Sequence, residues 1–152
     1  MDYSKAQIDE AWNKATIDEN NDPKIWRKDP CGAWINYNQY GKQSEYGWSI
    51  DHIIPKVLFN NNDYDSSSCN RRAMHWENNL KKSDDFPEYK CIIMSENVHN
   101  IRKENTKHIN EQTITSLLKE FSGLDSYIQK HKNEWISIYG KEKVEQWIRK
   151  KL

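Results

Sequence analysis

The stretch Asp-His-Ile-Ile-Pro at residues 51–55 decides the fold and the chemistry of this chain. Trp48 and Ile50 begin a short segment typical of a strand, which ends at Asp51 and His52. Pro55 prevents the strand from continuing, because proline has no backbone N–H to donate to a strand ladder. The pattern predicts a β-strand that ends in a carboxylate and an imidazole. Because neighbouring side chains on a strand point to opposite faces, Asp51 and His52 can approach one reacting group from different sides.

The segment that follows predicts a second strand and a helix. Residues 56–69 are rich in Asn, Asp and Ser, which favours a loop. Residues 70–75 can form a short strand, and residues 76–82 are typical of a helix that ends before Pro87. A helix packed across the two strands would bring Asn79 to the end of the first strand.

Three groups within about thirty residues have the chemistry that hydrolysis of a phosphodiester requires. Asp51 and Asn79 offer oxygen ligands to a hard divalent cation, which stabilises the charge on a pentacovalent phosphate. Histidine is the natural base near neutral pH, so His52 can take a proton from water. Asn70 carries an amide that can satisfy loop backbone groups in both directions. Each residue alone is more often a polar turn residue, so the prediction depends on the combination.

Residues 48–55, Asn70, and Asn79 followed by Lys-Ser-Asp at residues 82–84 resemble the HNH nuclease motif, also called the ββα-metal finger. The resemblance is to the form whose last letter is asparagine. That form occurs in the HNH domains of RNA-guided CRISPR effector nucleases, in some homing nickases and in many small bacterial and phage proteins. The similarity covers residues 47–84 well and does not cover the termini.

The resemblance implies a role for each motif residue. Asp51 and Asn79 would bind one divalent cation, Mg²⁺ or Mn²⁺, and His52 would be the general base. Asn70 would fasten the loop between the strands and so orient the histidine. DNA is the substrate that the resemblance implies.

Contacts with nucleic acid must come from local basic clusters, because 23 basic and 23 acidic residues leave no net charge. The first 80 residues carry 9 basic and 12 acidic residues, and the remaining 72 carry 14 and 11. Arg71, Arg72 and Lys82 are the predicted contacts, and Lys82 lies where the family often has a basic residue near the DNA backbone. His75 could contact phosphate, act as an extra metal ligand, or simply close a strand. Residues 149–151 could bind phosphate or form a solvated helix end.

The three cysteines do not predict a disulfide or a zinc site. Cys31, Cys69 and Cys91 are odd in number and form no C-x-x-C pair, which favours buried thiols. Many HNH proteins hold a structural zinc with two C-x-x-C pairs, but here the second pair is replaced by His75 and Asn78. We therefore predict no structural zinc and expect tryptophans to take over its structural role. These are Trp26, Trp34, Trp48 and Trp76.

The whole pattern predicts an α+β fold in a single domain, residues 1–152, with an HNH core at about 30–87. An N-terminal helix is indicated by apolar residues at helical spacing from Ile8 to Ala15. Two short strands are expected within residues 25–54 and another at residues 89–94. A C-terminal helical region is expected over about 88–152. Its three helices have apolar stripes at residues 114–121, 124–135 and 144–148.

The resemblance implies a DNA endonuclease. A cytoplasmic location is expected, because the sequence shows no secretory signal and no apolar run that could span a membrane. With one active site per chain, a monomer would nick one strand and a homodimer would cut both. Two other functions remain open. The chain could be a nucleic-acid-binding module without cleavage, or a toxin-type nuclease held by an immunity partner.

Overall fold

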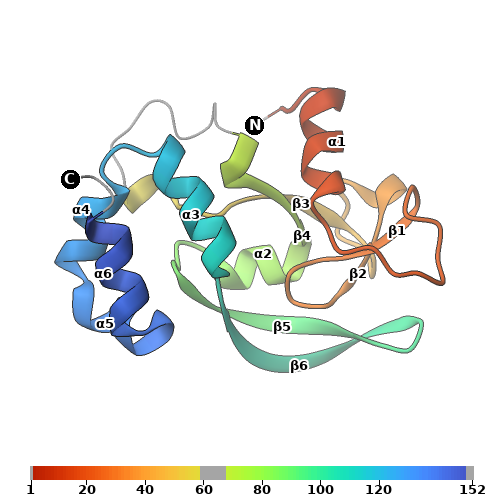
Figure 1. The fold of residues 1–152 in the computed structure, drawn as a ribbon. Coiled ribbons are helices and arrows are strands. Elements are labelled where there is room, and N and C mark those ends of the chain that lie inside the picture. The colour runs from red at the N-terminus through yellow and green to blue at the C-terminus, as the bar shows by residue number, and fades with distance from the viewer. Residues whose placement is uncertain (1, 59–67, 150–152) are drawn as a thin grey trace. The chain divides into compact units, whose positions relative to one another are not determined.

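The computed structural model describes residues 2–58 and 68–149 and has an α+β fold. Its contacts form two compact units, Met1–Lys107 and His108–Leu152, which are described separately. In chain order the helices and strands up to the unit boundary are α1 (Lys5–Asn13), β1 (Trp26–Lys28), β2 (Trp34–Asn36), β3 (Trp48–His52), β4 (Arg71–His75), α2 (Trp76–Lys82), β5 (Glu88–Glu96) and β6 (His99–His108). The strands pair as β1–β2, β3–β4 and β5–β6 (Figure 1).

The antiparallel sheet of β3 and β4 lies between α1 and α2 (Figure 1). Alternation along β3 divides its side chains between these helices. Trp48 and Ile50 join the apolar cluster formed with α1, whereas Asp51 faces α2, where it meets Lys82. Asp51 and His52 therefore lie on opposite faces, as the sequence predicts.

The turn that enters β3 requires a glycine. An ideal Cβ built on Gly47 would lie 1.8 Å from the carbonyl oxygen of Lys42, far inside van der Waals contact. The backbone carbonyl of Gly47 also accepts a hydrogen bond from the amide of Trp76, at the start of α2. This turn therefore links the first strand of the sheet to the helix that follows the second.

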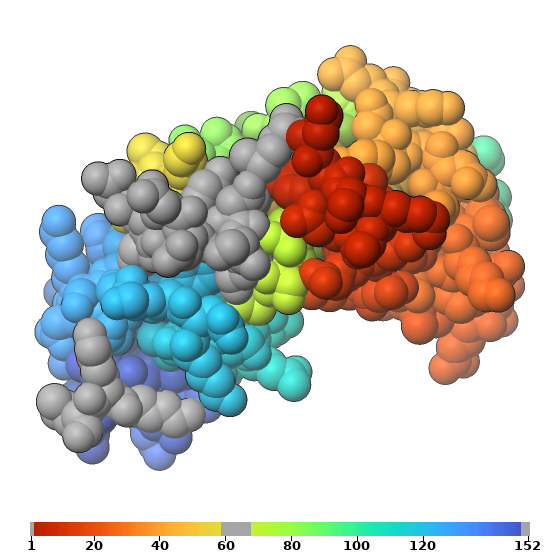
Figure 2. All heavy atoms as spheres, turned by 90° about the horizontal axis from the view of Figure 1, so that it is seen from above, coloured from red at the N-terminus to blue at the C-terminus, as the bar shows by residue number. Residues whose placement is uncertain are grey.

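The helix α1 is confirmed, and a complete capping box fixes its start. Ser4 accepts a hydrogen bond from the backbone of Gln7, whose side chain accepts one from the backbone of Ser4. Ala11 and Trp12 on its inner face are buried against Trp48 and the other sheet residues. In the space-filling view the atoms of the N-terminal segment lie directly beside those of β4 (Figure 2).

Strand pairing before β3 differs from the expected pair of strands within residues 25–54. Three strands form there. β2 pairs with β1, with Ile35 opposite Arg27, whereas β3 pairs with β4. Local composition gives strand propensity but does not specify the partner.

One helical prediction is wrong, because residues 99–108 were expected in the helical region and form the strand β6. The expected strand at 89–94 is confirmed and is part of the longer β5. Only Ile101 interrupts the polar run of β6, so the sequence carries neither apolar alternation nor an apolar helical stripe there. The helical region therefore begins about twenty residues later than residue 88.

The cysteine prediction is also wrong for two of the three residues. Cys31 and Cys91 form a disulfide across 60 residues of sequence, with their Cα atoms 5.7 Å apart. The pairing depends on β5 packing beside the loop that holds Cys31, which spacing along the chain does not reveal. Cys69 takes no part in a disulfide.

The second unit is a group of four short helices. They are α3 (Glu111–Glu120), α4 (Leu124–Lys130), α5 (Lys132–Tyr139) and α6 (Lys141–Arg149). The predicted stripes are confirmed, except that a break at His131 divides the second expected helix in two. Trp135 and Trp147 pack edge to face in its core, with ring centroids 6.2 Å apart.

The four tryptophans expected to take over the role of a structural zinc lie in separate ring contacts, and Trp76 stacks on His75. Trp26 and Trp34 meet edge to face, while Trp48 packs on Trp12 and Tyr40. Within residues 2–58 and 68–149, no helix has both the length and the apolar content to cross a membrane.

Candidate functional site

Asn70 fastens the chain just after β3. Its side-chain oxygen accepts a hydrogen bond from the backbone amide of Ile54 (2.7 Å), and its side-chain nitrogen donates to the carbonyl of the same residue (3.2 Å). The carbonyl of Asn70 also accepts from the amide of Ile53. Asn70 is fully buried, so these bonds are shielded from water. The turn that follows His52 is thus fixed in both directions, as the amide chemistry predicts. Most of the expected loop, residues 59–67, lies outside the described residues.

Asp51 lies in a buried cluster of charges. It stands opposite Arg72 in the strand register, and Nε of Arg72 donates to one carboxylate oxygen at 3.0 Å. Nζ of Lys82 lies 3.4 Å from the other oxygen. The side chain of Asp51 is 3% exposed and that of Lys82 is 0% exposed. Two cations therefore neutralise this carboxylate inside the protein.

Lys82 is bonded to backbone as well as to Asp51. It donates to the carbonyl oxygens of His52 (3.1 Å) and Ile53 (3.2 Å), which holds the end of β3 against α2. Burial lowers the pKa of Lys82, and the charge of Asp51 opposes that effect. Lys82 is therefore a buried structural residue that links α2 to the end of β3.

Asn79 lies on the same face of β3 as Asp51. Its side-chain nitrogen donates to Oγ of Ser49 at 2.8 Å and approaches the carbonyl of Ile50 at 3.4 Å. No residue that the structure describes donates a hydrogen bond to its side-chain oxygen. Asn79 and Ser49 also line a hollow of about 310 Å³, together with Lys42 and Trp76. Among the described residues, the side-chain oxygen of Asn79 therefore has no hydrogen-bond donor, and Asn79 lies beside an open space.

The donor set fits a hard divalent cation, with one condition. A carboxylate and an amide oxygen are ligands that Mg²⁺ accepts while it keeps several waters. The cation would have to displace the ammonium of Lys82 from Asp51, while Arg72 could keep the other oxygen. The described residues contain no cluster of three or more His, Cys, Asp or Glu side chains that could hold a metal.

His52 lies on the opposite face of β3, towards α1. Its Nε2 is 3.2 Å from the hydroxyl of Tyr3, and the two ring centroids are 6.3 Å apart. Sequence reasoning missed Tyr3, because it lies 49 residues away in the sequence with no motif around it. The start of a capping box after Tyr3 was the only local signal that its position is fixed.

The predicted nucleic-acid contacts have their polar groups turned to the protein. Arg71 is buried and lies 3.6 Å from Glu10 of α1, and Arg72 and Lys82 face Asp51. These placements do not favour direct contact with a phosphate backbone. In the terminal cluster, Arg149 pairs with Glu145, and residues 150–151 lie outside the described part of the chain.

His75 is a structural residue in this arrangement. It is 1% exposed and caps α2, where its Nδ1 accepts a hydrogen bond from the amide of Glu77. Its Nε2 lies 2.8 Å from the carbonyl oxygen of Glu45. Both ring nitrogens are therefore used in holding the turn between β4 and α2.

A buried hydrogen-bond centre, not noticed in the sequence, lies beside His75. Asp29 accepts from the backbone amides of Cys31 and Ala33 on one oxygen. On the other it accepts from the amide of His75 and the side chain of Asn78. Burial raises the pKa of Asp29, and these hydrogen bonds oppose the shift. Asp29 thus joins the loop after β1 to the start of α2.

Asn78 extends this centre to β5. Its side-chain oxygen accepts from the amides of Ile92 and Ile93, and its nitrogen also donates to the carbonyl of Ile93. The Cys31–Cys91 disulfide joins the loop after β1 to β5 covalently. His75 and Asn78, which stand where a second C-x-x-C pair would be, therefore belong to a hydrogen-bonded and disulfide-linked core.

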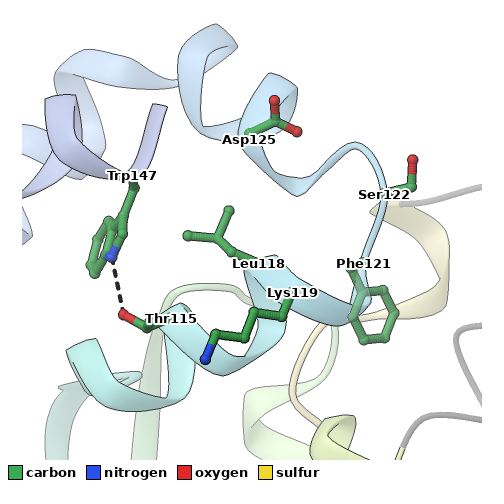
Figure 3. A pocket seen from close by; sticks show the side chains of 7 residues that line it. All are labelled: Thr115, Leu118, Lys119, Phe121, Ser122, Asp125 and Trp147. Carbon is green, nitrogen blue, oxygen red and sulfur yellow. Dashed lines mark hydrogen bonds between the residues drawn. The ribbon is translucent and has the colours of Figure 1, made fainter. Parts of the chain in front are cut away.

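The second unit has a pocket of its own, of about 500 Å³, between α3, α4 and α6 (Figure 3). Trp147 closes one side and donates a hydrogen bond from its indole to Oγ1 of Thr115. Phe121 and Lys119 line the other parts. It contains none of the predicted site residues.

Comparison of the chain with protein-family models, with curated proteins and with solved structures finds no match in any of the three. The functional argument therefore depends on the residues and their geometry.

Proposed function

We propose that this protein is a metal-dependent DNA endonuclease of the HNH type, with a ββα-metal core formed by β3, β4 and α2. The observation that carries the proposal is that Asp51 of β3 and Asn79 of α2 lie on the same side of β3, with His52 at the strand end. Asn70 supports it, because its hydrogen bonds fix the turn directly after His52. These are the roles that the motif assigns to its letters.

The residues divide the reaction between two sides of the strand end. Asp51 and Asn79 would hold the cation, which supplies charge stabilisation to the phosphate and the leaving oxygen. From the other face, His52 accepts the proton of the attacking water. Lys82 and Asn70 keep the two faces in fixed relation, because both bond to the backbone of residues 52–54.

A nucleic-acid-binding module without cleavage is the second candidate, and one observation favours it. Arg72 and Lys82 already neutralise Asp51, so the carboxylate is stable in the fold without a cation. A module that no longer cuts DNA could retain such a cluster for stability alone. The two candidates differ in whether a cation displaces Lys82 from Asp51.

The test is cleavage of supercoiled plasmid with Mg²⁺, Mn²⁺ or EDTA, comparing the wild type with His52→Ala. We expect the wild type to convert supercoiled DNA to nicked circles with either cation and to stop in EDTA. His52→Ala should lose at least about a hundredfold in rate, the usual contribution of a general base. Linear product that increases with protein concentration would indicate a homodimer.

His99→Ala is the matched control, because His99 is an exposed histidine of the same unit on β6. It should cut at the rate of the wild type. If His52→Ala cuts equally fast, His52 is not the base. If the wild type cuts no DNA with any cation, the binding module is the better description.

A further inference from the structure

We propose that Tyr3 is a positioning residue that sets the orientation and tautomer of His52. The proposal rests on the proposed function, because it gives His52 the role of general base. Its basis is the 3.2 Å contact between the hydroxyl of Tyr3 and Nε2 of His52. The two rings are tilted by 42°, so they meet through these polar atoms and not by stacking.

The position of Tyr3 is set by the start of α1. Tyr3 directly precedes Ser4, the N-cap residue, whose reciprocal hydrogen bonds with Gln7 define where the helix begins. Tyr3 and Ile8 both pack against the apolar core of the unit. A residue before the cap that packs with the fourth helical residue forms a hydrophobic staple, which fixes the angle at which the chain enters the helix. The start of α1 therefore fixes the position of the Tyr3 ring.

The helix is in turn fixed to the strands that carry His52. Trp12 is buried against Trp48 of β3, with ring centroids 5.3 Å apart. Nζ of Lys14, at the end of the helix, donates to the carbonyl of Arg71 at 2.7 Å, and Arg71 is the register partner of His52. Tyr3 and His52 are thus held by one rigid set of contacts.

The chemistry of a histidine base decides the direction of the hydrogen bond. A neutral imidazole carries its hydrogen on one nitrogen and a lone pair on the other. When Nε2–H of His52 donates to the hydroxyl oxygen of Tyr3, the lone pair is on Nδ1, which then accepts the proton from water. A carboxylate orients the histidine of a catalytic triad by the same logic. Here a neutral hydroxyl does so from an element outside the motif.

The experiment is the substitution Tyr3→Phe in the full chain, measured as steady-state nicking with Mg²⁺. The phenyl ring keeps the packing against the core and removes the hydroxyl that contacts His52. We expect kcat to fall about tenfold, the effect of one lost orienting hydrogen bond, and KM to stay unchanged. Tyr40→Phe is the control, because Tyr40 packs on Trp48 in the same core. It should retain the wild-type kcat.

A second measurement reports on His52 without DNA. Imidazole ¹⁵N chemical shifts should show the Nε2–H tautomer in the wild type and in Tyr40→Phe, and a mixture of tautomers in Tyr3→Phe. If Tyr3→Phe nicks DNA at the wild-type kcat and its His52 shifts are unchanged, the proposal is overturned. If the wild type itself cuts no DNA, the proposed function fails and this inference fails with it. That result is distinguishable because it precedes any comparison of variants.

Discussion

At the scale of single residues, Lys82 shows how position changes the meaning of a side chain. The sequence suggests a surface lysine near DNA, yet its ammonium is buried between Asp51 and two backbone carbonyls. The residues of the motif have specific contacts in the fold, as Asp51, Asn70 and Asn79 show. The motif cannot reveal that Arg72 and Lys82 point inwards, because their direction depends on the packing of α2 against β3.

The buried lysine predicts a pH dependence of stability. The pKa of Lys82 is lowered in the folded state from its usual 10.5, mainly by burial. Between the folded and unfolded pKa values the unfolded chain binds more protons, so the free energy of unfolding rises with pH in that window. At pH values below this window Lys82 is charged in both states, and the cost of burying its charge lowers the free energy of unfolding in full.

The measurement is urea unfolding of the wild type and Lys82→Met from pH 7 to 10.5. The stability of the wild type relative to Lys82→Met should increase as the pH rises. Lys81→Met, a change at the exposed neighbour, should leave a constant difference from the wild type. If the difference in free energy of unfolding between the wild type and Lys82→Met also stays constant over this pH range, the lowered pKa of the buried Lys82 is contradicted.

At the scale of elements, sequence reasoning succeeded where the pattern was local. The helix α1 and the succession of β3, β4 and α2 were predicted because each has its own apolar spacing or breaker. The strand β6 was missed because nine of its ten residues are not apolar, so it has no apolar pattern of its own. It is a strand because it pairs with β5. The same long-range packing of β5 brings Cys91 to Cys31, which no spacing rule could predict.

The disulfide predicts a large effect of reduction on the first unit. Cys31 and Cys91 are 60 residues apart, so the link removes much freedom from the unfolded chain. On the chain-entropy estimate, Cys91→Ser should lower the free energy of unfolding by about 4 kcal/mol. Denaturant unfolding of both proteins, with and without a reductant, measures this directly.

Cys69→Ser is the matched control for that experiment, because Cys69 is outside the disulfide. It should unfold like the wild type and should lose stability on reduction to the same extent. A Cys91→Ser variant as stable as the oxidised wild type would contradict a stabilising link.

At the scale of the whole molecule, the division after Lys107 is the main organising feature. The first unit contains both cysteines of the disulfide, the sheet of β3 and β4, and every predicted site residue. The expected core boundary at residue 87 lies before β5, which packs on α2 and holds Asn78. A folded core therefore needs the hairpin that follows.

Two fragments test this division. Residues 1–107 should fold alone, with a cooperative urea transition and the near-ultraviolet circular dichroism of packed aromatic residues. Residues 1–87 lack Cys91 and the β5 partners of Asn78, Ile92 and Ile93, so they should show neither signal. Cooperative unfolding of the shorter fragment would place the boundary at 87 instead.

Asn78 and Asn79 are chemically identical neighbours on α2 with opposite tasks. One is bound inside the core by Asp29 and β5, and the other faces Ser49 and the space beside it. In the observed alignment of α2, Asn78 bonds to Asp29 and to the backbone of β5. These bonds fix the rotation of the helix about its axis, and so they also fix the direction in which its neighbour Asn79 points. A carboxylate on the far side of the helix thus contributes to the geometry of the candidate site.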